Sequence, residues 1–323
     1  MTRHRRRSEE ETTTAPRLAR ADWTVSTLVC TRHRPDSLIR AVRSLLADVD
    51  GSLELFVMDQ SDGPESEQAL ACVAQDSRLH YVRSGARGKG AALNEGLRLA
   101  HGDIVVCTDD DCEAPPGWAT EMARVMNAQP RAAVVFCNVT ADPYDRTAGY
   151  VPTYERQSDR VLSSILDARH GLGLGAGMAL RRDEVLAFGG FDETFGPGSR
   201  FGSGDDWDLS LRVLLRGWDV YDTAHVSIRH HGFRTLSDGR SHALRDWIAI
   251  GALCAKPIRA GHLSGVVLAI CLFGVQALWP PLHDLLRLRR PRGLARIRGF
   301  IKGFGQGLRT PVDRETMVFR PTR

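Results

Sequence analysis

The chain has 323 residues, 42% hydrophobic and 25% charged, a composition that supports a sizeable core and excludes a largely disordered, collagen-like or disulfide-scaffold protein. Its net charge of +4 is uneven: residues 1–20 carry +3, residues 21–282 carry −7 and residues 283–323 carry +8. The acidic body argues against nucleic acid as the main ligand. The basic end predicts either contact with an anionic membrane surface or a solvated tail.

The first 22 residues are polar and charged without hydrophobic periodicity, and we expect residues 1–22 to form a disordered basic arm. No apolar stretch follows this basic start, so the sequence predicts no secretory signal. The seven cysteines are dispersed without a C-x-x-C pair, which is typical of a reducing compartment and argues against a structural zinc site. We therefore expect a cytoplasmic protein.

From Trp23 onwards, short apolar runs alternate with segments of helical periodicity. Strands are predicted at 25–31, 53–59, 79–83, 103–108 and 132–139. Helices are predicted at 35–46, from the polar turn 60–66 to about 75, at 88–100 and from 115 to about 127. This alternation predicts βαβ units and an α/β fold, with a mostly parallel central sheet flanked by helices.

The second half of the chain is less regular. Residues 140–170 contain several breakers, a glycine-rich strand is predicted at 171–180, and helices are predicted near 182–188 and 206–216. The glycine run GLGLGAG leads into a strand rather than a helix, so it fails the context test for dinucleotide binding.

Residues 263–282 form a run of twenty residues without a formal charge, with basic residues on both sides. Pro280 and Pro281 shorten its regular part to about seventeen residues, which is short for a membrane-spanning helix. We expect this segment to lie in the cytoplasmic leaflet, with a core helix packed on the catalytic domain as the alternative.

Polar residues follow three of the predicted strands, where parallel sheets bind ligands. Thr31 and Arg32 follow the first strand, and Asp59 and Asp62 follow the second. The adjacent carboxylates Asp109, Asp110 and Asp111 follow the strand at 103–108. Because adjacent carboxylates repel one another, this triplet indicates either a divalent cation site or an acidic surface turn.

Three other short patterns each allow two interpretations. Lys89 lies in a GKG turn that opens a helix, which suits either a phosphate or loop capping. Asp205 and Asp206 lie at the start of a predicted helix. They indicate either a general base or carboxylates that stabilise the positive end of the helix dipole. His230 is either a metal ligand or a structural residue.

Taken together, these pieces resemble glycosyltransferase family 2, which has the GT-A fold. The matching segments are, in order, CTRHRP, DQSDG, RGKGAALNEGL, TDDDCE, GAGMALRRDEV, GGFDE and GDDWDLSLRVLLRG. His230 lies 24 residues beyond Asp206, the offset at which the family pattern places a histidine. The resemblance spans about residues 23–232 and implies inverting transfer of a sugar from a UDP- or dTDP-linked donor to an acceptor hydroxyl.

The resemblance also implies roles for individual residues. The nucleotide sugar would be bound by Thr31, Arg32, Asp59, Asp62, Lys89, Asn94, Asp109 and Asp110. Asp111 and His230 would hold a divalent metal, Mn²⁺ or Mg²⁺, and Asp206 would be the catalytic base. Asp205 stands where the family usually has glutamate, so it remains the alternative base.

For the organisation of the chain, we expect a GT-A catalytic domain at 23–260, with a nucleotide-binding half at 23–139 and an acceptor-binding half at 140–260. An apolar and basic helical tail at 261–323 would associate with the inner face of the cell membrane. The acceptor would be a saccharide, a lipid-linked compound or a small molecule in the synthesis of bacterial cell-surface polysaccharide, glycolipid or glycosylated metabolites. The alternatives are a nucleotidyltransferase, whose usual glycine-rich loop is missing from CTRHRPDS, and an inactive GT-A-like binding protein.

Overall fold

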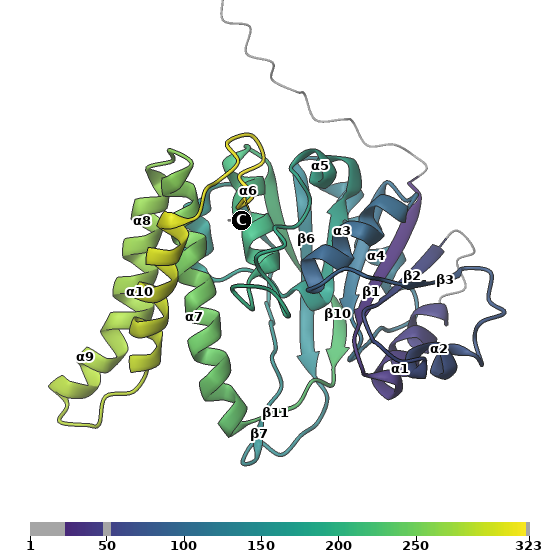
Figure 1. Cartoon of the computed structure of the whole chain (residues 1–323), viewed down its shortest axis with the longest axis horizontal. Coiled ribbons are helices and arrows are strands. Elements are labelled where there is room, and N and C mark those ends of the chain that lie inside the picture. Colours follow the sequence, from purple (N-terminus) through teal and green to yellow (C-terminus); the bar gives the residue numbers. More distant parts are fainter. Residues whose placement is uncertain (1–22, 48–52, 321–323) are drawn as a thin grey trace, which may run out of the picture.

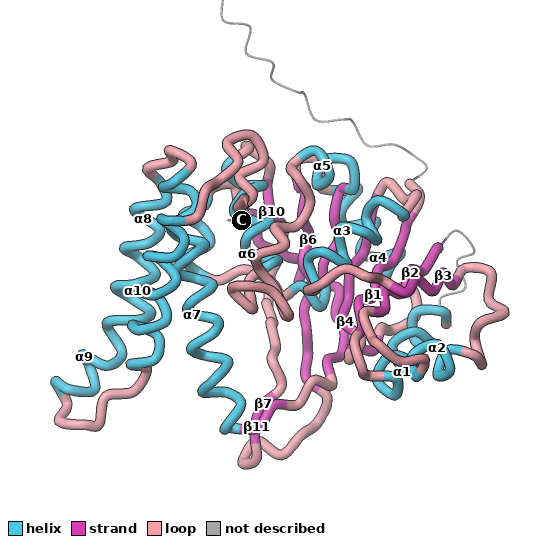
Figure 2. Tube along the Cα trace, viewed as in Figure 1, coloured by secondary structure: helices cyan, strands magenta, loops and turns pink. Residues whose placement is uncertain are grey.

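The structure of the chain is a computed structural model that describes residues 23–47 and 53–320. The arm predicted at residues 1–22 lies outside the described residues. The predicted α/β fold is confirmed, because one nine-stranded sheet forms the centre of the molecule and helices flank it (Figures 1 and 2).

The strands of the central sheet come from most of the length of the chain. They are β1 (Val25–Thr31), β2 (Leu53–Asp59), β3 (Leu79–Arg83), β4 (Ile104–Asp109), β5 (Cys112–Glu113), β6 (Ala132–Ala141), β8 (Arg160–Leu162), β9 (Met178–Arg181) and β10 (Asp219–His230). Their order is β3-β2-β1-β4-β9-β6-β10-β5, with β8 also paired to β10. A separate small sheet pairs β7 (Gly149–Tyr150) with β11 (Arg234–Thr235).

The sheet contains both parallel and antiparallel pairs, and its longer pairings are parallel. Strands β1 to β4 pair in parallel, as do β6 and β10, whereas β9, β5 and β8 pair antiparallel to their neighbours. Of the glycine-rich strand predicted at 171–180, Met178–Arg181 alone is continuous strand, because the 3-10 turn η2 (Gly175–Gly177) precedes it. Strand β9 enters from this turn without a crossover helix, and a parallel pairing would need such a crossover.

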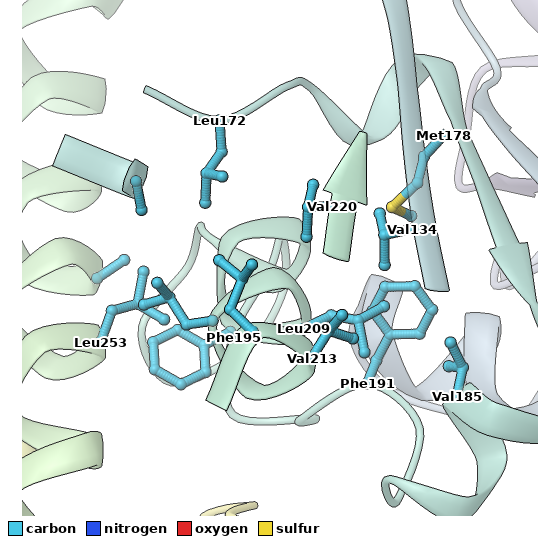
Figure 3. Packing of buried hydrophobic residues seen from close by; sticks show 14 of the residues in the cluster. Val134, Leu172, Met178, Val185, Phe191, Phe195, Leu209, Val213, Val220 and Leu253 are labelled. Carbon is cyan, nitrogen blue, oxygen red and sulfur yellow. The ribbon is translucent and has the colours of Figure 1, made fainter. Parts of the chain in front are cut away.

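The two faces of the sheet carry separate apolar layers, because alternate strand residues point to opposite faces. Leu28 packs with the layer that contains α3 (Lys89–Leu99), α5 (Arg182–Ala187) and α6 (Asp205–Leu215). Its neighbour Val29 packs with the layer that contains α1 (Pro35–Leu46), α2 (Glu65–Leu70) and α4 (Trp118–Ala128). Figure 3 shows part of the first layer, where side chains from α6 meet the sheet and Leu253.

A further helical layer lies beside the sheet, on the side of α6 (Figure 1). It consists of α7 (Leu236–Arg259), α8 (Ser264–Cys271), the π-helix η3 (Leu272–Leu278), α9 (Trp279–Leu286) and α10 (Leu294–Arg309). Helix α10 turns Gly299, Gly303 and Gly307 towards α7, and a Cβ atom built at Gly303 would lie 1.8 Å from the Ile248 carbonyl oxygen. The four-residue spacing of these glycines therefore lets the two helices pack in close contact.

The expectation that Pro280 and Pro281 shorten the apolar segment is wrong, because the helical segment continues from Ser264 to Leu286. The prolines occupy the first turn of α9, where a helix tolerates them. Pro280 cannot donate to the Gln276 carbonyl, and this oxygen accepts a hydrogen bond from Arg296 Nη1 at 3.1 Å instead.

The chain then returns from α10 to the body of the molecule, and the C label in Figure 1 lies over α6. Phe319 is buried, with its ring 5.8 Å from that of Phe195 and 5.7 Å from that of Phe201. Its backbone N–H donates to Asp192 Oδ2 at 2.7 Å. The last described residues therefore contribute to the core beside the N-terminus of α6.

Candidate functional site

The carboxyl ends of β1, β2, β4 and β10 lie at one edge of the sheet and bring several of the predicted residues together. Thr31 is the register partner of Asp59, and Cys30 is the partner of Asp109. His230, the last residue of β10, pairs with Cys112 of β5. Residues that are up to about two hundred positions apart in the sequence therefore meet at this edge.

The acidic triplet is held by the turn that follows β1. Thr31 Oγ1 donates to Asp110 Oδ2 at 2.8 Å, and Arg34 Nη1 lies 3.1 Å from Asp110 Oδ1 and 3.0 Å from Asp111 Oδ2. Burial raises the pKa of Asp110 to about 6, against the opposing effect of Arg34. Arg34 was not among the residues predicted from the sequence, whereas Arg32 was, and both arginines are exposed. The position of Arg34 directly before Pro35, the first residue of the predicted helix, was the signal that could have identified it.

Asp111 and His230 face each other across the end of the sheet. His230 Nε2 lies 3.2 Å from Asp111 Oδ1, while Nδ1 lies 2.9 Å from the Pro152 carbonyl oxygen. Because a carbonyl accepts hydrogen bonds, Nδ1 carries a proton. Asp111 raises the pKa of His230, so Nε2 is also protonated when it contacts this carboxylate, and loss of that proton would free a lone pair for a cation. Burial alone would raise the pKa of Asp111, but His230 and Arg34 lower it to about 2. This oxygen and nitrogen pair fits a divalent cation.

Cys112 completes a group of three potential metal ligands whose donor atoms lie within 4.8 Å of one another, the others being Asp111 and His230. Burial raises the pKa of the Cys112 thiol well above its ordinary value. A neutral thiol is a poor ligand for Mn²⁺ or Mg²⁺, which prefer oxygen donors. The sequence analysis did not name Cys112, although it directly follows Asp111.

Lys89 stands between two groups of carboxylates. It begins α3 after Gly88, whose φ of 90° suits glycine, and its Nζ contacts Asp109 Oδ1. Burial alone would lower the pKa of Lys89, but Asp109 and Asp205 raise it well above its ordinary value. The same ammonium group stabilises the charged forms of Asp111 and Asp206. Lys89 therefore links the triplet after β4 with the pair that opens α6.

Asp205 and Asp206 begin α6 after Gly204, which has a φ of 82°. Asp206 accepts hydrogen bonds from the backbone N–H of Gly175 at 2.7 Å and of Trp207 at 2.8 Å. Burial and the neighbouring charge of Asp205 raise the pKa of Asp206 to about 7. A carboxylate with this pKa can take a proton near neutral pH, as a general base requires.

Four predicted residues lie further from this group or are bound within the protein. Asp59 accepts from the Ser61 N–H at 2.8 Å and the Tyr81 hydroxyl at 2.7 Å. Asn94 Oδ1 accepts from the Phe191 N–H at 2.7 Å, and Nδ2 donates to the Phe191 carbonyl at 2.9 Å. Arg32 is exposed, as is the side chain of Asp62 at 88%. Asp59 and Asn94 thus support turns next to the site.

A cavity of about 420 Å³ lies elsewhere, between α4 and β10. Trp118, Tyr221 and His225 are among its lining residues, and the predicted site residues are not.

The predicted site residues at the ends of the strands and at the start of α6 are distinguished by their charge. Five carboxylates gather there with Lys89 and Arg34, so the group has an excess of negative charge that a cation would balance. The carboxylates are Asp109, Asp110, Asp111, Asp205 and Asp206; together we call them the site carboxylates.

Comparison with known proteins agrees with this arrangement. A family model described as glycosyl transferase family 2 matches residues 26–187, half of the chain. Beta-monoglucosyldiacylglycerol synthase of Trichormus variabilis is 24% identical over 219 residues, which are 65% of this chain and 45% of that protein. Glucosyl-dolichyl phosphate glucuronosyltransferase of Haloferax volcanii is 25% identical over 183 residues, 53% of this chain and 57% of that protein. The chain thus spans about half the length of these curated relatives.

The fold has a solved counterpart. The mannosyltransferase PcManGT from Pyrobaculum calidifontis, in complex with GDP-Man and Mn²⁺, has a TM-score of 0.60 to this chain at 17% identity. The likeness covers 91% of this chain and 89% of that chain, and it confirms the GT-A fold expected from the sequence.

Proposed function

Because the chain belongs to glycosyl transferase family 2, we propose that it transfers a sugar from a nucleoside-diphosphate sugar to an acceptor hydroxyl, with inversion at the anomeric carbon. The observation that carries this proposal is the presence of two differently tuned carboxylates at one site. Asp111, with a pKa of about 2, stays ionised, whereas Asp206, with a pKa of about 7, can exchange a proton at neutral pH. Pairs of carboxylates with separated pKa values are typical of catalytic sites.

We assign the nucleotide to the ends of β1, β2 and β4, with Thr31, Asp59 and Asp109 around the base and ribose, as UDP or dTDP. The diphosphate would lie near Lys89, which adds positive charge to the N-terminus of α3. Arg34 would contribute a second cation. Asp111 and His230 would hold Mn²⁺ or Mg²⁺, which supplies Lewis acidity that stabilises the departing diphosphate oxygens. The Mn²⁺ in the complex of PcManGT supports this choice of metal.

Asp206 is the proposed base. In this role its carboxylate accepts the proton of the acceptor hydroxyl as that oxygen attacks the anomeric carbon, while the N–H groups of Gly175 and Trp207 hold its two oxygens in place. Asp205 is the weaker candidate, because a Cβ atom at Gly196 would lie 2.9 Å from its Cγ atom, so this side chain packs against the loop.

The test is a panel of UDP-, dTDP- and GDP-sugars with purified protein and Mn²⁺, measured by release of the nucleoside diphosphate. We expect release with at least one donor, and about a hundred- to ten-thousand-fold less with Asp206→Asn. Release of inorganic diphosphate from a nucleoside triphosphate and sugar phosphate would show a nucleotidyltransferase instead. Donor binding without turnover in the presence of any acceptor would show a binding protein.

For the acceptor we propose a lipid-linked compound at an anionic membrane surface. The names of both curated relatives contain a lipid, diacylglycerol in one and dolichyl phosphate in the other. In this chain the segment Ser264–Leu286 is long and apolar enough to cross a membrane, with a mean hydropathy of 1.8, yet 33% of it is buried. A core helix can have the same length and composition, so the packing of the segment decides between the two positions.

The packing of this segment favours a position on the membrane surface. Its inner side contacts the protein, where the Phe273 ring lies 5.0 Å from the Phe300 ring in a tilted pair and Gln276 Nε2 donates to the Arg169 carbonyl at 2.9 Å. Its outer side exposes large apolar residues, including Ile270 at 66% and Trp279 at 53%. A segment held on one side by protein cannot be surrounded by lipid, but its outer side can enter the headgroup region.

Basic residues surround this outer side and would add attraction to anionic lipids. Arg287, Arg289 and Arg290 follow α9 and are exposed. Each basic residue near such a surface contributes about 1 kcal/mol. We therefore propose a peripheral protein on the cytoplasmic face of the membrane.

Sedimentation with vesicles of phosphatidylcholine containing phosphatidylglycerol tests this proposal. Wild-type protein and the control Leu99→Asp, at a 40% exposed position at the end of α3 and outside the helical layer of α7 to α10, should bind equally, while Ile270→Asp should bind more weakly. Protein that ignores anionic vesicles would contradict membrane association and leave the lipid-linked acceptor without support.

A further inference from the structure

Two buried carboxylates stand at the two ends of the loop that leads into α6. Asp192 precedes the loop and Asp208 lies in the first turns of the helix, and they are 0% and 1% exposed. Lys256 of α7 reaches both: its Nζ lies 2.5 Å from Asp192 Oδ2 and also contacts Asp208 Oδ1. One ammonium group from a different layer of the fold therefore joins the two ends of residues 193–207.

The surrounding groups complete the charge balance. Arg212 Nε donates to Asp208 Oδ2 at 2.8 Å, and its other nitrogens donate to the carbonyls of Phe188 and Gly190. Burial alone would raise the pKa of Asp192, but Lys256 lowers it below its ordinary value. Two carboxylates thus face two cations, so this group is neutral as a whole. We call Asp192, Asp208, Arg212 and Lys256 the buried clamp.

The loop held by the buried clamp depends on glycine. Gly196, Gly198, Gly202 and Gly204 all have positive φ, between 72° and 89°, a region that other residues rarely adopt. A loop this rich in glycine has high conformational entropy, so its folded shape needs support from outside. In the folded protein it reaches the other half of the site, because the Lys89 N–H donates to the Pro197 carbonyl at 3.0 Å.

The loop ends in the two residues that matter for the proposed reaction, Asp205 and Asp206. Asp208 is one α-helical half-turn beyond Asp206, so a contact that fixes Asp208 also fixes the first turn of α6. Figure 3 shows Phe195 of the loop next to Leu253 of α7 and Leu209 of α6. Lys256 Nζ lies 4.7 Å from the centre of the Phe195 ring and 4.6 Å from that of Phe319. The apolar contacts and the ion pairs therefore hold the same three elements together.

We propose that Lys256 is a positioning residue for the transfer reaction, which holds the half-buried Asp206 beside Asp205 by binding Asp192 and Asp208. This inference rests on the proposed function only for its effect on turnover. Lys256 does not belong to the site itself, and it acts through the loop and the first turn of α6. Donor binding should depend on Lys256 less than turnover does, because Asp111 and His230 lie outside residues 193–207 and the loop reaches Lys89 through the Pro197 carbonyl.

The test is Lys256→Met with two readouts that a purely structural role would not change. First, turnover per folded molecule should fall about a hundred-fold, as expected for a misplacement of about 1 Å, while the KM for the donor changes little. Second, the pKa of Asp206, followed by carboxyl ¹³C NMR without substrate, should fall below its wild-type value. The groups that face Asp206 are Asp205 and Lys89, and loosening the turn separates Asp206 from the Asp205 charge and from burial.

The matched control is Arg181→Met. Arg181 is also buried, at 7% exposed, and donates to the carbonyls of Ala132, Met126 and Gln129, away from the loop. It should lower the unfolding temperature without moving the pKa of Asp206. If Lys256→Met does not fold, the double variant with Asp192→Asn removes one charge of each sign, keeps Asp208 paired with Arg212, and is measured in the same way.

The outcomes separate this inference from the proposed function. Normal turnover per folded molecule with an unmoved Asp206 pKa overturns the role of Lys256 and leaves the transferase proposal intact. Wild-type protein that turns over no donor overturns the proposed function, while a lowered Asp206 pKa in Lys256→Met still supports the positioning role.

Discussion

The protein buries two groups of charged side chains beside the same loop, and they differ in how their charge is balanced. In the buried clamp, Asp192 and Asp208 are matched by Arg212 and Lys256, and all four are at most 2% exposed. The site carboxylates face Lys89 and Arg34 and keep an excess of negative charge. The first group fastens α6 and α7 together, and the second lies between the strand ends and the start of α6, where we propose that the ligand binds.

This difference shows how burial and charge together indicate the role of a carboxylate. Where protein cations meet each charge, a carboxylate is kept ionised, as the lowered pKa of Asp192 indicates. Where burial outweighs the nearby cations, it raises the pKa, to about 6 for Asp110 despite its contact with Arg34 and to about 7 for Asp206. An unbalanced buried group costs folding free energy, so its retention is typical of a functional site.

The largest expected effect is on catalysis. Asp206→Asn removes the proposed base and should lower turnover by about a hundred- to ten-thousand-fold, with donor affinity nearly unchanged. Steady-state kinetics at saturating donor measures this effect. Asp205→Asn is the matched variant, and a greater loss there than in Asp206→Asn would exchange the roles of the two carboxylates.

The next effect is on stability and belongs to the buried clamp. Arg212→Met leaves Asp208 with less positive charge and two carbonyls without their donor, and should lower the free energy of unfolding by about 3–5 kcal/mol. Chemical denaturation measures it. The control is Arg124→Met at an exposed pair with Glu121, where the change should stay within about 0.5 kcal/mol. Equal losses of stability in Arg212→Met and Arg124→Met would contradict the stabilising role of the buried clamp.

A smaller effect concerns the metal. Asp111→Asn should weaken Mn²⁺-dependent nucleotide binding by about ten- to a hundred-fold, because it removes the anionic oxygen that faces His230 Nε2. Isothermal titration with and without a chelator shows whether the metal contribution is lost. Nucleotide affinity in the wild type that a chelator does not change would contradict the assignment of Asp111 and His230.

Much of the fold could be predicted from the sequence, because strands that are buried on both faces consist of consecutive apolar residues. The predicted strands at 25–31 and 53–59 have the same bounds as β1 and β2. Strand β10 was not predicted, since Asp219 and Asp222 interrupt its apolar pattern, and these residues are buried by pairing with Arg131 and Arg160. Such pairs join distant parts of the chain and leave no local pattern.

The site was less predictable for the same reason. Asp109, Asp111 and His230 were named because they follow strands or match the family pattern. The contacts that set their chemistry come from elsewhere in the chain, such as Arg34 for the triplet. The buried clamp was not predicted, although GGFDE and GDDWDL both contain its carboxylates, because Lys256 lies 48 residues beyond Asp208. Neither residue carries a signal until the fold places them side by side.

The central claim is that Asp206 carries a charge that the protein does not balance, and the pH dependence of stability tests it most directly. The pKa of Asp206 is raised from 3.8 to about 7 on folding, so its contribution is fully present below about pH 4 and is lost as the pH rises through about 7. Between pH 5 and 7.5 the free energy of unfolding of the wild type should therefore fall relative to that of Asp206→Asn. The expected relative loss is on the order of 1–2 kcal/mol. A difference between the two proteins that stays constant over this range would contradict the claim.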